Sequence, residues 1–70
     1  MVDISNIEND LQSYKDALEN LEQTFSDVQN MSFSEANPEI SNAKAVVNSA
    51  KAKVMQDMEN ALQTLIDANS

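Results

Sequence analysis

Acidic side chains recur in this sequence at a spacing that could support chemistry. Asp16, Glu19 and Glu22 follow one another at three-residue steps, which on a helix places successive carboxylates on adjacent turns. Such pairs act as acid and base, or bind a metal, where a pocket shifts their pKa values. The sequence contains no His, Cys or Gly to supply a basic partner, a zinc ligand or the turn of a calcium loop. We therefore expect a solvated acidic surface and no enzyme, with no catalytic residue, no metal site and no cofactor.

The overall charge narrows the classes of partner. The 70 residues include 12 acidic residues and 4 lysines, for a net charge of −8. This charge repels phosphate backbones and anionic lipids, so we expect no nucleic-acid partner. No stretch approaches the roughly 20 apolar residues of a membrane span, and no signal-peptide pattern is present. We expect no membrane insertion, no small-molecule substrate and a chain that is cytoplasmic as synthesised, with export without a cleaved signal peptide left open.

Large apolar residues in the first half define a helix. They recur at alternating steps of three and four residues, the spacing of a coiled-coil seam. The seam consists of Ile4, Ile7, Leu11, Tyr14, Leu18, Leu21, Phe25 and Val28. This pattern predicts a helix over about 3–30, capped at its start by Asp3 or by Ser5 in a Ser5-Asn6-Ile7-Glu8 capping box.

Ser and Asn residues interrupt the pattern and predict a loop over 31–37. Asn37 as N-cap and Pro38 in the first turn predict a second helix over about 38–68. We expect Phe33 to fold back over the end of the hairpin. The sequence thus predicts one all-α domain over 1–70, an antiparallel helix–loop–helix hairpin with coiled-coil packing.

Apolar residues of the second helix follow two lines. The first line, expected to meet the first helix, is Ile40, Ala43, Val47, Ala50, Val54, Met58, Ala61 and Leu65. The second line, expected to bind a partner, is Val46, Met55, Leu62 and Ile66. One neighbouring helix cannot cover so wide a face, and a hairpin of this size buries little core. We therefore expect self-association or a helical protein partner.

Charge is distributed unevenly between the two helices. Residues 3–30 contain seven acidic residues and one Lys, whereas residues 38–70 contain four acidic residues and three Lys. In an antiparallel hairpin the three lysines of the second helix come level with acidic residues of the first. We expect Lys44, Lys51 and Lys53 to reach Glu22, Glu19 and Asp16. Exposed pairs of this kind set the register of the helices more than they add stability.

Several short segments resemble parts of the needle subunits of bacterial type III secretion systems. They are Asn37-Pro38, Val47-Asn48-Ser49, Asp57 and the apolar tail Leu62, Leu65 and Ile66. Those subunits are small helix–loop–helix proteins whose long second helix packs through a filament. The hairpin also resembles the small helical proteins of type VII secretion, although the Trp-x-Gly turn of that family is absent from residues 30–37. Both resemblances imply a structural subunit or adaptor of a secretion-type assembly.

Two other functions fit the sequence. A small acidic inhibitor or chaperone, encoded by a phage or a bacterium, would cover a basic surface of a partner protein with its first helix. An antiparallel homodimer would instead form a plain four-helix bundle with no further partner.

Overall fold

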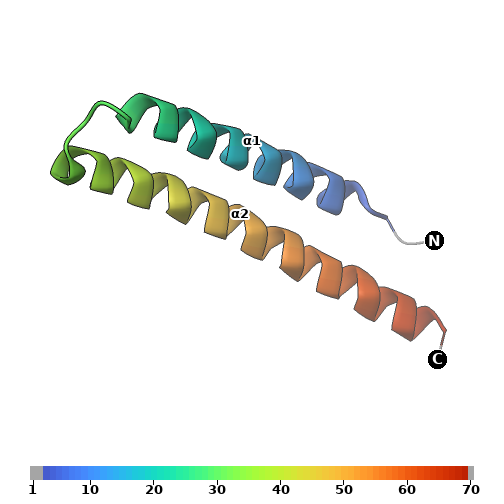
Figure 1. The fold of residues 1–70 in the computed structure, drawn as a ribbon. Coiled ribbons are helices and arrows are strands. Elements are labelled where there is room, and N and C mark those ends of the chain that lie inside the picture. Colours follow the sequence, from blue (N-terminus) through green and yellow to red (C-terminus); the bar gives the residue numbers. More distant parts are fainter. Residues whose placement is uncertain (1–2, 70) are drawn as a thin grey trace.

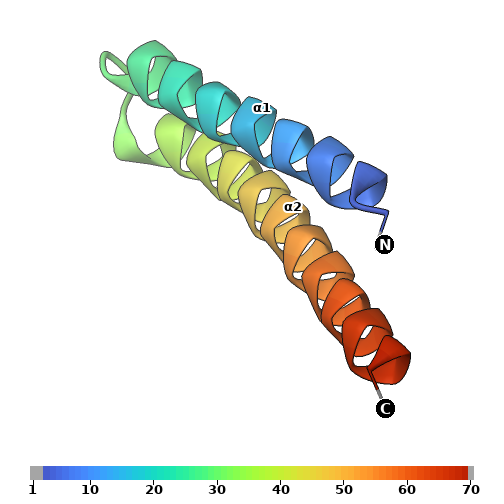
Figure 2. The same cartoon turned by 90° about the vertical axis from the view of Figure 1, so that its right-hand side faces the viewer.

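The computed structural model describes residues 3–69 as two antiparallel helices. Helix α1 spans Ser5–Val28, helix α2 spans Phe33–Ala68, and residues 29–32 connect them. The hairpin is 57 Å long and 16 by 10 Å across, and the helices diverge towards their free ends (Figures 1 and 2). The predicted all-α helical hairpin is confirmed.

Helix α1 begins at Ser5, two residues later than the sequence suggested. One Asp3 oxygen accepts hydrogen bonds from the Ser5 amide at 2.9 Å and from the Ser5 hydroxyl at 2.6 Å. These bonds hold the pKa of Asp3 below its usual value. Of the two expected capping residues, Asp3 satisfies a free amide, whereas Ser5 lies inside the helix and its hydroxyl is already bound to Asp3. The Ser5–Glu8 capping box therefore does not form.

Helix α2 begins at Phe33, earlier than the expected loop over 31–37 and helix over 38–68. Ser32 is its N-cap: the Ser32 hydroxyl accepts a hydrogen bond from the Glu35 amide at 3.4 Å and donates one to the Glu35 carboxylate at 3.1 Å. Ser32-Phe33-Ser34-Glu35 thus has the Ser-x-x-Glu sequence of a capping box. This cap lies ahead of Asn37-Pro38 and shortens the loop to four residues.

Pro38 consequently lies in the second turn of α2 and not in the first. It has no N–H to donate to the carbonyl of Ser34, four residues earlier, so one hydrogen bond of the helix is missing there. The helix continues through this position for 30 further residues, to Ala68. Pro38 therefore weakens the start of α2 without ending it.

Each helix contributes a heptad pattern of buried and half-buried residues to the contact between the helices. Along α1 the buried and half-buried residues are Ile7, Asp10, Tyr14, Ala17, Leu21, Thr24 and Val28. Along α2 they are Ala36, Ile40, Ala43, Val47, Ala50, Val54, Asp57 and Ala61. Alternating steps of three and four on both helices are the pattern of an antiparallel coiled coil. The buried hydrophobic residues are small: Ala17, Val28, Ala43 and Val54.

The predicted seam of α1 is divided between two environments. Helix α2 covers Ile7, Tyr14, Leu21 and Val28. The other four members are exposed, as are Met58 and Leu65 of the line that was expected to meet α1. Those four are Ile4, Leu11, Leu18 and Phe25. One neighbouring helix cannot cover the whole apolar width of α1, so these four residues stay exposed. The small residue Ala17 faces α2 instead, and its small side chain allows the two helices to approach each other.

Candidate functional site

Large exposed apolar side chains are the main candidate for a functional surface. On the α1 side they are Ile4, Leu11, Leu18 and Phe25, and on α2 they are Met55, Met58, Leu62, Leu65 and Ile66. Each of them is between 43% and 58% exposed. We call these nine residues the apolar face.

The two halves of the apolar face lie on the same side of the hairpin. Leu11 follows the half-buried Ile7 by four residues, and Met58 follows the buried Val54 by four residues. Both therefore occupy the same flank of their helix, and in an antiparallel pair these flanks adjoin. The seven-residue repeat extends this relationship along the hairpin. The contacts of Asp10 with Lys53 and Asp57 set the levels: Leu11 comes between Lys51 and Met58, and Ile4, seven residues earlier, comes between Met58 and Leu65.

A shallow hollow marks the α2 half of the apolar face. It has a volume of about 360 Å³ and is lined by Met55, Met58, Glu59 and Leu62. Methionine side chains are flexible and fit varied surfaces, so this hollow can accept an apolar side chain of another helix. Glu59 places one carboxylate at its rim.

The opposite flank of the hairpin is mainly polar. A hollow of about 280 Å³ near the free ends is lined by Asp3, Asn6, Ile7, Asp57, Asn60, Ala61 and Thr64. Val46 also lies on this flank, because it is nine residues from Met55, which is about two and a half turns of helix. Of the four residues expected to bind a partner, Met55, Leu62 and Ile66 therefore share the apolar face, and Val46 lies on the other side of α2.

Lysines border the loop half of the apolar face. Lys44 and Lys51 follow Ile40 and Val47 by four residues and so share the flank of Met58. Within residues 3–69 neither lysine forms an ion pair, and the expected contacts with Glu22, Glu19 and Asp16 are not made. Lys44 and Lys51 are therefore available to a partner.

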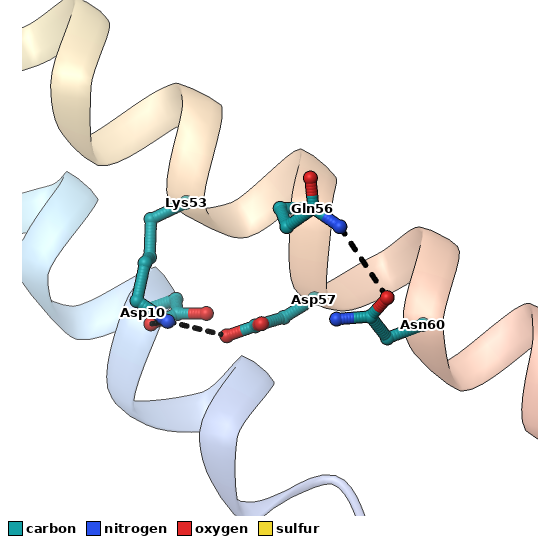
Figure 3. A network of polar contacts seen from close by, with 5 residues as sticks. All are labelled: Asp10, Lys53, Gln56, Asp57 and Asn60. Carbon is teal, nitrogen blue, oxygen red and sulfur yellow. Dashed lines mark hydrogen bonds and ion pairs between the residues drawn. The ribbon is translucent and has the colours of Figure 1, made fainter.

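Lys53 belongs to a polar cluster between the helices. Its ammonium lies 3.0 Å from one oxygen of Asp57 and 3.9 Å from one oxygen of Asp10, and the three side chains point towards one another (Figure 3). Asp10 is only 8% exposed, and its second oxygen has no hydrogen-bond partner. The sequence reasoning missed this cluster. Its signal was the seven-residue spacing of Asp10, Ala17 and Thr24, which matches that of the larger residues.

The two carboxyl groups of this cluster titrate differently. The nearby Asp57 carboxylate, together with burial, raises the pKa of Asp10. Hydrogen bonding from Asp10 and from Lys53 lowers the pKa of Asp57. The hydrogen bond from Lys53 to Asp57 and the attraction between Lys53 and Asp10 raise the pKa of Lys53. Asp10 is thus the first of the two to take up a proton, which it can share with Asp57.

The acidic residues considered for chemistry lie apart from this cluster. Asp16, Glu19 and Glu22 are exposed on α1. Across residues 3–69, no three acidic side chains gather closely enough to hold a metal ion. Phe33, expected to fold back over the hairpin, is instead 82% exposed. Neither helix in this part of the chain has a segment long and apolar enough to cross a membrane.

Comparison of the chain with known protein families, characterised proteins and solved structures found no match.

Proposed function

We propose that this protein is a non-enzymatic assembly subunit or adaptor that works by burying its apolar face against another helical surface. The observation that supports this function best is the apolar face itself. Nine large side chains lie together on one side of a hairpin and remain about half exposed. Contiguous apolar surface of this extent on a small protein is typical of interaction sites.

The exposed area of the chain supports the same function. The chain exposes 5413 Å², whereas a folded monomer of 7.7 kDa exposes roughly 4,300 Å². The excess of about 1,100 Å² is similar to the area that each partner buries in a specific protein interface. An interaction along the apolar face would remove this excess.

The core of the hairpin is too small to give a single chain more than marginal stability. The buried hydrophobic residues between the helices are two alanines and two valines, and no large side chain among the described residues is fully buried. Burying such small side chains offsets little of the conformational entropy lost on folding. The missing stabilisation would come from association.

We propose a bacterial secretion-type assembly, with a needle-like filament as its form, as the setting of this function. This part of the proposal rests on the resemblance of the α2 segments, including Val47-Asn48-Ser49, Asp57 and the tail at Leu65. Asn37-Pro38 supports the resemblance less, because it lies inside α2 and not in a loop.

The acidic surface of α1 favours a second candidate function. Glu19, Glu22, Gln23 and Ser26 line an open hollow of about 360 Å³ on the outside of α1. An acidic inhibitor or chaperone would present this surface to a basic protein. Its binding would weaken steeply with added salt, because exposed charges are screened, whereas binding through the apolar face would not.

The concentration dependence of thermal unfolding tests the proposed function. We expect the midpoint, followed by circular dichroism, to rise with protein concentration, because association stabilises the folded chain by mass action. A midpoint independent of concentration, together with the mass of a single chain, would contradict an assembly subunit that associates with itself.

A further inference from the structure

We infer that Met55 and Met58 form an oxidation site whose state decides whether the apolar face can be buried. In the free chain a peroxide converts the two thioethers to sulfoxides, and the oxidised chain no longer associates. The inference rests on the proposed function, because it concerns the surface that association would bury. It names peroxides as the class of reagent that acts on this surface.

Met55 and Met58 lie together on one side of α2. They are three residues apart, so their side chains lie on adjacent turns of the helix. Both are about half exposed, and both line the hollow of about 360 Å³ on the apolar face. Hydrogen peroxide is little larger than water, which occupies about 30 Å³ in the liquid. The hollow therefore admits a peroxide molecule in the free chain.

The reaction at each methionine transfers one oxygen atom. The thioether sulfur attacks one oxygen of hydrogen peroxide, so that a sulfur–oxygen bond forms and the oxygen–oxygen bond breaks. The released hydroxide takes the proton from the oxygen now on sulfur and leaves as water. The sulfur loses two electrons and the peroxide gains them. The product is methionine sulfoxide, in which a flexible apolar side chain has become polar.

The sulfoxides act on association and not on the fold of the hairpin. Neither Met55 nor Met58 is buried between α1 and α2, so water solvates both sulfoxide oxygens in the free chain. In an interface along the apolar face the same oxygens would be desolvated among apolar side chains, which is unfavourable without a hydrogen-bond donor. We expect each buried sulfoxide to lower the association constant by about tenfold or more.

Association in turn protects the two methionines. When the apolar face is covered, peroxide reaches Met55 and Met58 only during the time that the chain is free. Met31 is exposed to a similar degree but lies in the connection between the helices, outside the apolar face. Peroxide therefore modifies free chains and spares associated ones, while Met31 gives the reactivity of an unprotected methionine in the same molecule.

Peroxide treatment of the full-length chain at two concentrations tests the site. Sedimentation velocity first identifies one concentration at which the chain is a single copy and one at which it is associated. After brief treatment with hydrogen peroxide, mass spectrometry of peptide fragments measures the sulfoxide at each methionine. We expect the oxidation of Met55 and Met58, relative to that of Met31, to fall several-fold at the higher concentration. The fully oxidised chain should sediment as a single helical copy, and methionine sulfoxide reductases should restore its association.

Two variants identify the methionines that cause the effect. Leu and Met have similar volumes and replace each other at little cost. We expect Met55→Leu/Met58→Leu to associate like the natural chain both before and after peroxide treatment, although it keeps Met1 and Met31. Met31→Leu should remain as sensitive to peroxide as the natural chain.

The contrary results separate this inference from the proposed function. Association that survives complete oxidation of Met55 and Met58, or that is lost equally in oxidised Met55→Leu/Met58→Leu, would overturn the inference and leave the proposed function standing. A sulfoxide ratio independent of concentration in an associating chain would do the same. A natural chain that is a single copy at every concentration before oxidation would overturn both. If the double variant fails to associate before oxidation, the sulfoxide ratio of the natural chain and its recovery on reduction decide the question.

Discussion

Asp10 on α1 faces Asp57 on α2 across the interface, with the ammonium of Lys53 3.9 Å from Asp10 and 3.0 Å from Asp57. This is a polar layer in a contact that is otherwise largely apolar. A polar layer of this kind costs stability in a coiled coil but fixes its register. The same layer makes the folded state sensitive to pH, because the pKa values of Asp10 and Asp57 move in opposite directions.

We predict that stability is greatest at mildly acidic pH. The raised pKa of Asp10 means that the folded chain holds this proton more tightly than the unfolded chain. The free energy of unfolding therefore falls as pH rises from the ordinary value of 3.8 through the raised pKa of Asp10. The lowered pKa of Asp57 acts in the opposite direction, so stability is lost as pH falls below 3.8. Urea unfolding at a series of pH values measures both slopes.

Asp10→Asn provides the control for this prediction. The amide has a similar shape, can donate a hydrogen bond to Asp57 and does not titrate. We expect the variant to be more stable than the natural chain at neutral pH, and this difference to disappear well below pH 3.8, where Asp10 is protonated in both states. Parallel pH profiles for the two chains would show that Asp10 does not cause the dependence.

Leu18 and Leu21 are consecutive members of the predicted seam of α1, but their environments differ. Leu21 is half-buried against α2, whereas Leu18 is exposed. At concentrations where the chain is a single copy, we expect Leu21→Ala to lower the free energy of unfolding by about 2–5 kcal/mol. We expect Leu18→Ala to cost less than about 1 kcal/mol there. At higher concentrations Leu18→Ala should weaken association. Equal costs at low concentration would mean that α1 is rotated from its described position.

Pro38 lies in the second turn of α2, where its missing N–H costs a hydrogen bond. We predict that Pro38→Ala stabilises the chain, by up to about 3 kcal/mol. The exposed neighbour Glu39→Ala serves as the control and should change stability by less than about 0.5 kcal/mol. If α2 instead began at Pro38, the Pro would fit the first turn, and Pro38→Ala would leave the urea midpoint unchanged or lower it.

The sequence predicts the hairpin well because the periodicity of large apolar residues and the single break near residue 32 are local signals. The division of the α1 seam is not local. The residues at Leu18 and Leu21 are equally apolar, and which one faces α2 depends on the small residues Ala17 and Ala50 that let the helices approach. The predicted start of α2 was wrong for a similar reason. Ser32 and Asn37 are both good N-cap residues, and which of them begins the helix depends on the whole folded structure.

Sedimentation velocity of Met55→Lys and Val46→Lys tests most directly whether the apolar face is the interaction surface. Met55 and Val46 lie on the same helix and are each 51% exposed, but only Met55 belongs to the apolar face. We expect Val46→Lys to associate like the natural chain, and Met55→Lys to sediment as a single helical chain, because an unpaired ammonium buried at an interface costs several kcal/mol. Association that persists in Met55→Lys, or that is lost equally in Val46→Lys, would contradict this account.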